Sequence, residues 1–426
     1  MNQNKSITLR RIKQLLVLIF QVSILVDLIS GFCQVQLHTY IPICPLLRVI
    51  IMGAIIYLLS KRATSIIIRL PLIQVLFFLI ASSIWVLIYG LEPNNGANLG
   101  IEIDSFSKIL YFFLILNFFI VYREEIKRLD PLRIISRYGL LISAAVVISF
   151  LTGFGNETHN TNYGFGSKSY FKGGNDLGLT ILYTAVVSSL YLMSRFEWKR
   201  VVILLIISSG AILIGSRVGL IGIFSWLTML ICYIVFIYRP DSQRLRRKLL
   251  HYKPIILFIY IIGTCVVGYY LLTTFDTFML YKYSSTGLRT ARTLLTDPAE
   301  IYISKFDWYE VAFGKGMASL YYFVANSTGA WVEYRMVEAD FHELLGGYGF
   351  FGFIVIISPF FYFLLKALKR YFSHPNFTLF AILFVTASFL VIAYVAGHCL
   401  RNTMVAPIYA YIVSLIYYEK ERSIDK

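Results

Sequence analysis

Apolar runs of about 20 residues recur along this chain, and they constrain its fold more than any other feature. A helix of that length rises about 30 Å, the thickness of the hydrocarbon core of a bilayer. Only 15% of the residues are charged, whereas a soluble domain carries roughly 25%. A single soluble core is therefore excluded, and the sequence predicts an all-α polytopic membrane protein.

Twelve membrane-spanning helices are predicted, together with one large, partly helical external loop. The predicted spans cover residues 14–33, 41–60, 70–90, 103–122, 133–153, 176–194, 200–215, 217–238, 254–273, 346–365, 377–396 and 402–418.

Joined into one helix, the seventh and eighth spans would be about 58 Å long, nearly twice the thickness of the bilayer core. Gly215-Ser216-Arg217 is therefore predicted to form a tight reversal. The chain divides into helices in 1–273, the external loop 274–345, and the last three helices with a tail in 346–426.

Basic residues concentrate in alternate connections, which indicates how the chain is oriented. One set of connections holds 26 of the 39 Lys and Arg residues: 5–13, 61–69, 123–133, 195–200, 239–253, 366–370 and 420–426. Cytoplasmic loops carry such an excess, so both termini are predicted to be cytoplasmic. The net charge of +16 then reflects membrane orientation and attraction to anionic lipid, and no nucleic-acid partner is predicted.

The N-terminus and the cysteines indicate no processing signal and no metal centre. The first span, 14–33, is too long for a signal peptide and lacks a small-x-small cleavage site, so an uncleaved helix is predicted. Only Cys33 and Cys44 stand where two cysteines could pair, although buried free cysteine also serves as a small apolar residue. The cysteines lack metal-ligand spacing, and neither a metal nor another cofactor is predicted.

The external loop 274–345 contains its own helical signals. Asp297-Pro298-Ala299-Glu300 is typical of a helix start, with an N-cap, a proline at the first position and a capping glutamate. The stretch 301–313 then predicts a helix, which Gly314-Lys315-Gly316 ends. The loop is thus predicted to form a small folded layer over the membrane helices.

Apart from flank residues such as Arg137, which snorkel at the inner end, ionisable residues inside the spans lie in the outer third or at the outer end of their helix. They are Asp27, Arg48, Asp104, Lys108, Arg217 and Arg401, with His398 beside the last. A charge at the bilayer centre costs at least about 2.5–3.5 kcal/mol, so each needs a reason. One reason is snorkelling to the headgroups. The other is a cationic pocket at the outer surface for a phosphate or diphosphate, which suits the planar fork of arginine.

Two further groups lie in or beside the external loop. Arg289 and Arg292 are spaced i,i+3 on a predicted short helix, which indicates either a solvated basic face or a shared anionic partner. The acidic stretch 337–349 runs into the tenth span and contains Glu338, Asp340, His342 and Glu343. On a helix, Glu338 and His342 would be i,i+4 neighbours, and a carboxylate or imidazole there could deprotonate an incoming hydroxyl.

Three stretches resemble the O-antigen polymerase and O-antigen ligase superfamily of bacterial envelope enzymes. The first is Tyr170-Phe171-Lys172-Gly173-Gly174-Asn175-Asp176-Leu177-Gly178, which opens a predicted helix. The second is Ile214-Gly215-Ser216-Arg217-Val218-Gly219. The third runs from Glu338 to Gly349-Phe350-Phe351-Gly352, a polar motif followed by Gly-x-x-Gly. About a dozen spans with one large external loop late in the chain also fit this superfamily.

The resemblance implies a metal-independent, inverting glycosyltransferase of the bacterial cytoplasmic membrane that uses polyprenyl-diphosphate-linked sugars. In the ligase branch a His-Asn pair stands where this chain has Glu338, so the resemblance favours the polymerase branch. Glu338 or Asp340 is the expected base, with His342 as the alternative. Arg217 and Arg289 match arginines expected to bind the diphosphate. Other expected substrate-binding residues are Arg292, Arg335, Arg401, His398, Lys108 and Arg48.

The expected activity joins lipid-linked repeat units into O-antigen, capsule or exopolysaccharide. The expected partners are the lipid-linked oligosaccharide, membrane lipid, a chain-length regulator and a flippase. Two alternatives are an O-antigen ligase and a lipid-linked oligosaccharide flippase. Flippases usually show two related halves and charges near the membrane midplane, and this sequence shows neither.

Overall fold

The structure is a computed structural model of the chain. It describes residues 2–39, 41–62, 73, 76, 80, 83–84, 96, 98–158, 166–171, 173–238, 243–274, 285–397 and 399–418. Most of the predicted span 70–90 lies outside these residues.

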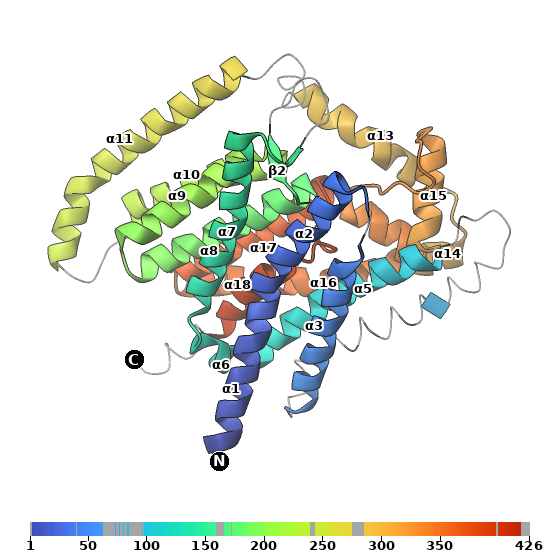
Figure 1. Cartoon of the computed structure of the whole chain (residues 1–426), viewed down its shortest axis with the longest axis horizontal. Coiled ribbons are helices and arrows are strands. Elements are labelled where there is room, and N and C mark those ends of the chain that lie inside the picture. The colour runs from blue at the N-terminus through green and yellow to red at the C-terminus, as the bar shows by residue number, and fades with distance from the viewer. Residues whose placement is uncertain are drawn as a thin grey trace.

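Helices account for nearly all of the described secondary structure (Figure 1). Before the large loop they are α1 (Asn2–Val17), the π-helical turn η1 (Leu18–Val22), α2 (Ser23–Gln36), α3 (Ile43–Ser60), α5 (Leu99–Val121), α6 (Arg123–Lys127), α7 (Pro131–Thr152), α8 (Gly174–Ser194), α9 (Trp198–Leu213), α10 (Arg217–Cys232), the π-helical turn η2 (Tyr233–Ile237) and α11 (Gln243–Thr274). After it they are α13 (Ser285–Ser304), α14 (Trp308–Phe313), α15 (Met317–Ser327), α16 (Asp340–Ser373), α17 (Phe377–Val395) and α18 (Ala406–Tyr418). The strands β1 (Asn156–Glu157) and β2 (Ser167–Ser169) pair antiparallel.

Nine helices of the described part of the chain are long and apolar enough to span a membrane. They are Ile7–Gln36, Ile43–Ser60, Leu99–Val121, Pro131–Thr152, Gly174–Ser194, Arg217–Ile237, Tyr252–Tyr269, Asp340–Ser373 and Phe377–Val395. Two more predicted spans correspond to shorter helices, α9 with 16 residues and α18 with 13. The predicted all-α polytopic fold is confirmed.

Aromatic side chains join the central helices. Phe360 of α16 stacks on Phe389 of α17 with ring centroids 4.8 Å apart, and Phe389 contacts Tyr409 of α18 at 4.4 Å. Phe112 of α5 lies 5.6 Å from both Phe389 and Tyr409. All four side chains are buried, so α5, α16, α17 and α18 form one rigid group. On the other side of α8, Trp226 of α10 donates a hydrogen bond to Ser189 of α8 (3.0 Å).

The predicted reversal at Gly215-Ser216-Arg217 is present. α9 ends at Leu213, Gly215 has a φ of +68°, and α10 begins at Arg217. Ser216 caps α10 by accepting a hydrogen bond from the Gly219 N–H (3.1 Å). The pairing considered for Cys33 and Cys44 is absent, because both are free thiols.

The large loop is a helical layer, but its first helix differs from the prediction. Helix α13 begins at Ser285 and continues through Pro298, so Asp297 does not start a helix. Leu295 and Ala299, on either side of the predicted helix start at Asp297, are both buried on one face of α13. Their burial favours a helix that continues through Asp297. The capping box forms instead at Asp307, whose N–H donates to the Glu310 side chain (2.8 Å). The predicted helix over 301–313 is not continuous, because α13 ends at Ser304 and α14 begins at Trp308; only its predicted end at Gly314 is confirmed.

Backbone contacts fasten this layer to α16, which begins at Asp340 and not at the predicted residue 346. Lys315 N–H donates to the Gly346 carbonyl (3.1 Å), and Gly316 N–H donates to the Gly347 carbonyl (2.9 Å). Gly349, the first glycine of the Gly-x-x-Gly motif, kinks α16 with φ +65° and ψ −170°. A Cβ there would lie 2.5 Å from the Gly314 nitrogen. The motif glycine therefore permits the close approach of the two segments.

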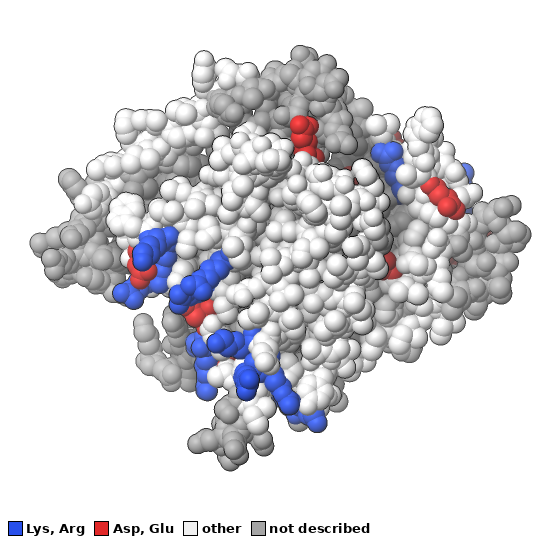
Figure 2. Space-filling model, viewed as in Figure 1, with Lys and Arg blue, Asp and Glu red and all other residues white. Residues whose placement is uncertain are grey.

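Lysines and arginines gather at one end of the bundle, called here the basic end. Figure 2 shows them at lower left, where α1 and α6 lie in Figure 1. Arg62 pairs with Glu125 of α6 (2.8 Å), and the Lys366 Nζ lies 4.0 Å from the Tyr417 ring centroid. Tyr417 is also within electrostatic reach of Arg123. The basic end thus brings together three connections that are predicted to lie on the same side of the membrane: 61–69, 123–133 and 366–370. The opposite end, called the loop end, carries the β-hairpin and α13–α15.

We predict that the loop end faces away from the cytoplasm, because cytoplasmic loops carry the excess of Lys and Arg. Ser304 is exposed at the loop end and Ser373 at the basic end. In a cysteine-free background, a membrane-impermeant maleimide added to intact cells should label Ser304→Cys, whereas Ser373→Cys should react only after permeabilisation. Labelling of Ser373→Cys alone in intact cells would reverse the orientation.

Candidate active site at the loop end

Glu338 lies in a strained turn immediately before α16. Its φ is +60°, a conformation that costs a non-glycine residue about 1–3 kcal/mol and that clusters at functional sites. The Glu343 carboxylate holds this turn, because its Oε1 accepts the N–H groups of Val337 (3.1 Å) and Glu338 (3.2 Å). Gly397 supports it from the other side, where a Cβ would lie 2.5 Å from the Glu338 carbonyl carbon. The half-buried Glu338 is therefore fixed in place by α16 and by the chain after α17.

The predicted i,i+4 pairing of Glu338 and His342 is wrong. Glu338 precedes the helix, which begins at Asp340, so the two side chains do not share a helix face. His342 instead has its Nε2 3.1 Å from Oε1 of Glu300 on α13. The imidazole thus joins α16 to the large loop.

Asp340 anchors the segment 396–405 between α17 and α18, whose described residues, 396–397 and 399–405, are non-helical and mostly buried. Its Oδ2 accepts the N–H groups of Cys399 (2.8 Å) and Leu400 (3.1 Å), and only 2% of Asp340 is exposed. Buried non-helical backbone needs such partners, because its N–H groups cannot reach water. Asp340 is therefore a positioning residue for this segment.

Arg401 is held by a carboxylate and a phenol. One guanidinium nitrogen donates to Oε2 of Glu343, and another donates to the hydroxyl of Tyr321 on α15. Burial disfavours the charged form of Arg401, but Glu343, Tyr321, Asp340 and Tyr348 together outweigh it and raise the pKa of Arg401 above its ordinary value. Burial raises the pKa of Tyr321, which therefore remains a neutral phenol. Arg401 is a permanent cation inside an ion pair.

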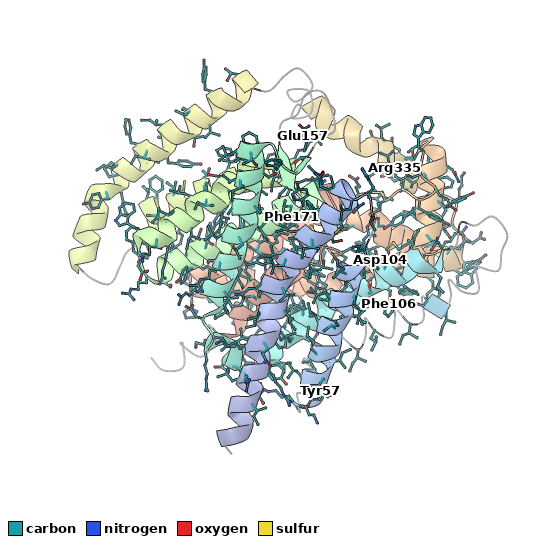
Figure 3. All side chains as sticks on the ribbon, viewed as in Figure 1. Tyr57, Asp104, Phe106, Glu157, Phe171 and Arg335 are labelled. Carbon is teal, nitrogen blue, oxygen red and sulfur yellow. The ribbon has the colours of Figure 1, made fainter. Side chains whose placement is uncertain are left out.

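Three of the charges predicted at outer helix ends meet between α3 and α5. The Arg48 Nη1 lies 3.2 Å from the Asp104 Oδ1 and donates to the Ser107 hydroxyl (2.8 Å). The Lys108 Nζ lies 2.5 Å from the other Asp104 oxygen. Lys108 is also within electrostatic reach of Arg401, which links the two ion-pair groups. Figure 3 labels Asp104 near the start of α5.

Glu102 connects α5 to the large loop. Its Oε1 accepts the Ala318 N–H (2.7 Å) in the first turn of α15, where unpaired N–H groups and the helix dipole favour an anion. Glu102 is 7% exposed, so this bond is shielded from water. The loop is thereby tied to α5 as well as to α16.

Arg217 begins α10, and the start of α10 adjoins the start of α8. A Cβ at Gly178 of α8 would lie 2.2 Å from the Ser216 hydroxyl and 3.1 Å from the Gly219 nitrogen. The start of α8 is also bound to the segment 396–405, because the Asn402 side-chain amide donates to the Asp176 carbonyl (3.0 Å). The starts of α8 and α16 therefore both bind this segment, and the start of α10 packs on the start of α8.

The remaining predicted site residues either lie around this group of helix starts or have side chains that the structure does not describe. Arg335 is exposed, and its backbone N–H donates to the Tyr321 carbonyl (3.1 Å) (Figure 3). Arg289 and Arg292 lie on α13 with side chains outside the described set, and His398 is outside the described residues. Among the described residues no group of three His, Cys, Asp or Glu is placed to hold a metal ion.

Sequence reasoning did not select four residues that hold the centre together. They are Glu102, Tyr321, Glu343 and Asn402. The acidic character of Glu102 and Glu343 was visible, but their partners are remote in sequence. No sequence signal marked Tyr321 or Asn402.

A comparison with protein families identifies the chain. The model of a family described as O-antigen ligase like membrane protein matches residues 10–279. The chain belongs to this family. No curated protein matches it. The matched region includes the starts of α8 and α10 and ends before Glu338, so it covers two of the three stretches on which the resemblance rests. Membership indicates glycosyl transfer in O-antigen assembly.

The Glu343–Arg401 pair yields a prediction about stability. Removing one partner of a buried ion pair leaves an uncompensated charge and typically costs about 3–5 kcal/mol. Arg401→Met and Glu343→Gln should therefore each lower the thermal unfolding temperature of the purified protein in detergent. The double variant should lose less stability than the sum of the two single losses, because it leaves no orphaned charge. Strictly additive losses would show that the pair is not coupled.

Proposed function

We propose that this family member is a polymerase that joins polyprenyl-diphosphate-linked oligosaccharide repeats at the external face of the bacterial cytoplasmic membrane. The observation that carries the proposal is that the starts of α8 and α16 both bind the chain between α17 and α18, while the start of α10 packs on the start of α8. These helix starts contain the three stretches that resemble the O-antigen polymerase and ligase superfamily. Residues far apart in sequence thus supply one site at the loop end.

The donor diphosphate is proposed to lie at the starts of α8 and α10. Helix N-termini bind anions through their free N–H groups and the helix dipole. Arg217 occupies the first position of α10 and adds a guanidinium whose planar fork matches a phosphate. Arg289 and Arg292 on α13 are proposed to contact the same group. Fixed cations there stabilise the negative charge that grows on the departing diphosphate.

Glu338 is the proposed general base. A sugar hydroxyl of the incoming repeat attacks the anomeric carbon of the donor, and its proton passes to the Glu338 carboxylate. The new carbon–oxygen bond forms as the bond to the diphosphate breaks, so the anomeric configuration inverts and no metal takes part. Asp340 and Glu343 are proposed to position Glu338, because their oxygens already accept backbone N–H groups. Arg401, Lys108 and Arg48, each paired with a carboxylate, are proposed to support the same geometry.

The choice of polymerase over ligase rests on Glu338, which stands where the ligase branch has a histidine. The two activities share the donor and differ in the acceptor, which is a second lipid-linked repeat for a polymerase. Purified protein given only one lipid-linked repeat as substrate therefore distinguishes them. A ladder of multiples indicates a polymerase. No product from the repeat alone, followed by transfer once a separate glycolipid core is added, would indicate a ligase.

Glu338→Gln should abolish elongation while leaving the protein folded. The amide keeps the size of the side chain but cannot take a proton, and loss of a general base typically costs about 10²- to 10⁴-fold in rate. Chain formation in reconstituted vesicles supplies the measurement. The matched control is Glu333→Gln, which makes the same change at an exposed site in the same connection and should elongate normally. Wild-type ladders from Glu338→Gln would remove Glu338 from the mechanism. If His342→Ala were then inactive, the base would be His342.

Arg217→Lys should lose elongation activity although it preserves the positive charge. Lysine cannot form the two parallel hydrogen bonds of a guanidinium, and loss of one such stabilising donor costs about 10²- to 10³-fold in turnover. Arg195→Lys, at an exposed site of the basic end, is the matched control and should behave as wild type. Normal polymer from Arg217→Lys would show that Arg217 acts only as a snorkelling charge.

A further inference from the structure

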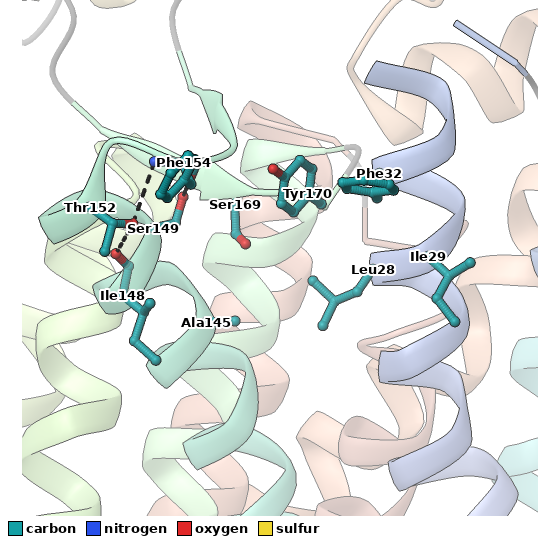
Figure 4. A pocket seen from close by; sticks show the side chains of 10 residues that line it. All are labelled: Leu28, Ile29, Phe32, Ala145, Ile148, Ser149, Thr152, Phe154, Ser169 and Tyr170. Atoms are coloured by element: carbon teal, nitrogen blue, oxygen red, sulfur yellow. Dashed lines mark hydrogen bonds between the residues drawn. The ribbon is translucent and has the colours of Figure 1, made fainter. Parts of the chain in front are cut away.

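An apolar pocket of about 470 Å³ lies between α2 and α7, near the loop end (Figure 4). This volume falls in the range of about 300–1,000 Å³ that is usual for ligand sites. The pocket is lined by Leu28, Ile29, Phe32, Ala145, Ile148, Ser149, Thr152, Phe154, Ser169 and Tyr170. Both helices are candidate membrane spans, and Ile29 and Ile148 at the pocket are 52% and 60% exposed. The pocket therefore opens toward the hydrocarbon of the bilayer.

The hydroxyl groups on α7 at this pocket already have partners. Ser149 donates to the Phe154 carbonyl and lies 2.8 Å from the Ser167 hydroxyl. Thr152 donates to the Ile148 carbonyl (2.7 Å). No charged side chain of the described residues lines the pocket. A polar ligand would lose its hydration there without gaining bonds, so the chemistry selects a hydrocarbon chain.

The β-hairpin forms the roof of the pocket. The Tyr170 ring meets the Phe32 ring of α2 edge to face, with centroids 5.3 Å apart. Gly31 lets α2 touch the hairpin backbone, since a Cβ there would lie 1.6 Å from the Tyr170 carbonyl oxygen. Figure 4 shows both rings above Leu28 and Ala145. A chain in the pocket thus lies in the membrane directly beneath the hairpin.

The chain that forms the roof of the pocket continues directly into α8, whose start belongs to the candidate active site. Tyr170 is four residues from Gly174, where α8 begins. The start of α8 is the place proposed for the donor diphosphate, and it adjoins Arg217 at the start of α10. Only four residues thus separate the roof of the pocket from the site proposed for the headgroup. This connection favours a substrate lipid over a bulk phospholipid.

We propose that the pocket between α2 and α7 binds the diphosphate-proximal isoprene units of the donor's polyprenyl chain. The inference rests on the proposed function, because it assigns a place to the lipid of that reaction. Apart from Tyr170, which begins the first of the three sequence stretches, it adds residues that neither these stretches nor the candidate active site contains. The pocket would hold the chain while the hairpin separates it from the aqueous chemistry above.

Photo-crosslinking with a polyprenyl diphosphate that carries a diazirine near its diphosphate end tests this directly. In wild-type protein in nanodiscs, labelled peptides should map to α2 and the last turns of α7. Excess polyprenyl phosphate should suppress the label, whereas excess phosphatidylglycerol should not. Ala145→Trp fills the pocket and should reduce the label about tenfold or more, equivalent to at least about 1.4 kcal/mol. Ala144→Trp makes the same change one residue away, at a position that does not line the pocket, and should keep the label.

The outcomes separate this inference from the proposed function. Equal competition by phosphatidylglycerol would show an ordinary lipid site and overturn the inference, as would labelling that maps elsewhere. Full labelling of Ala145→Trp would also overturn it. Labelling does not require turnover, so Glu338→Gln should be labelled like the wild type. Specific labelling of a protein that makes no polymer from the repeat would support the polyprenyl pocket and contradict the polymerase activity. Polymer formation without labelling at α2 and α7 would support the polymerase activity and contradict the polyprenyl pocket.

Discussion

Two carboxylates in the first turns of α16 hold the loop end together. Asp340 accepts two N–H groups from the buried segment after α17, and Glu343 accepts two from the turn that contains Glu338. Each unsatisfied backbone group would cost several kcal/mol in a medium without water. The second oxygen of Glu343 binds Arg401, so one side chain joins a strained turn to a buried cation. The position of Glu338 depends on these bonds.

The large loop is part of the same unit. Its backbone donates to Gly346 and Gly347 of α16, and Glu102 of α5 accepts a bond from the start of α15. The glycine motif therefore acts through close backbone approach, and it does not contribute a reactive side chain. Rigid elements with fixed side chains are what a catalytic arrangement requires. The loop thus helps to fix the site in addition to covering it.

Three cations in the described part of the loop end are paired within the protein. Arg48 and Lys108 share Asp104, while Arg401 is matched by Glu343. Such pairing lowers the cost of keeping cations near the bilayer, and it fixes their geometry. The proposed diphosphate site lies instead at the starts of α8 and α10, where Arg217 and the helix N-termini act together. The apolar pocket beneath the hairpin lies on the lipid-facing side of the same region.

The sequence by itself determined the features that depend on neighbouring residues: the membrane helices, the reversal before Arg217, the end of α14 at Gly314 and the basic residues that share one end. Hydropathy, glycine and loop charge act over one or two helical turns, so they are visible in the chain. Only the tertiary structure decided that α13 continues through Asp297, because burial of Leu295 and Ala299 outweighs a local capping pattern. It also separated Glu338 from His342 and paired Glu343 with Arg401, 58 residues away. Such pairings follow from how helices pack, and no local pattern encodes them.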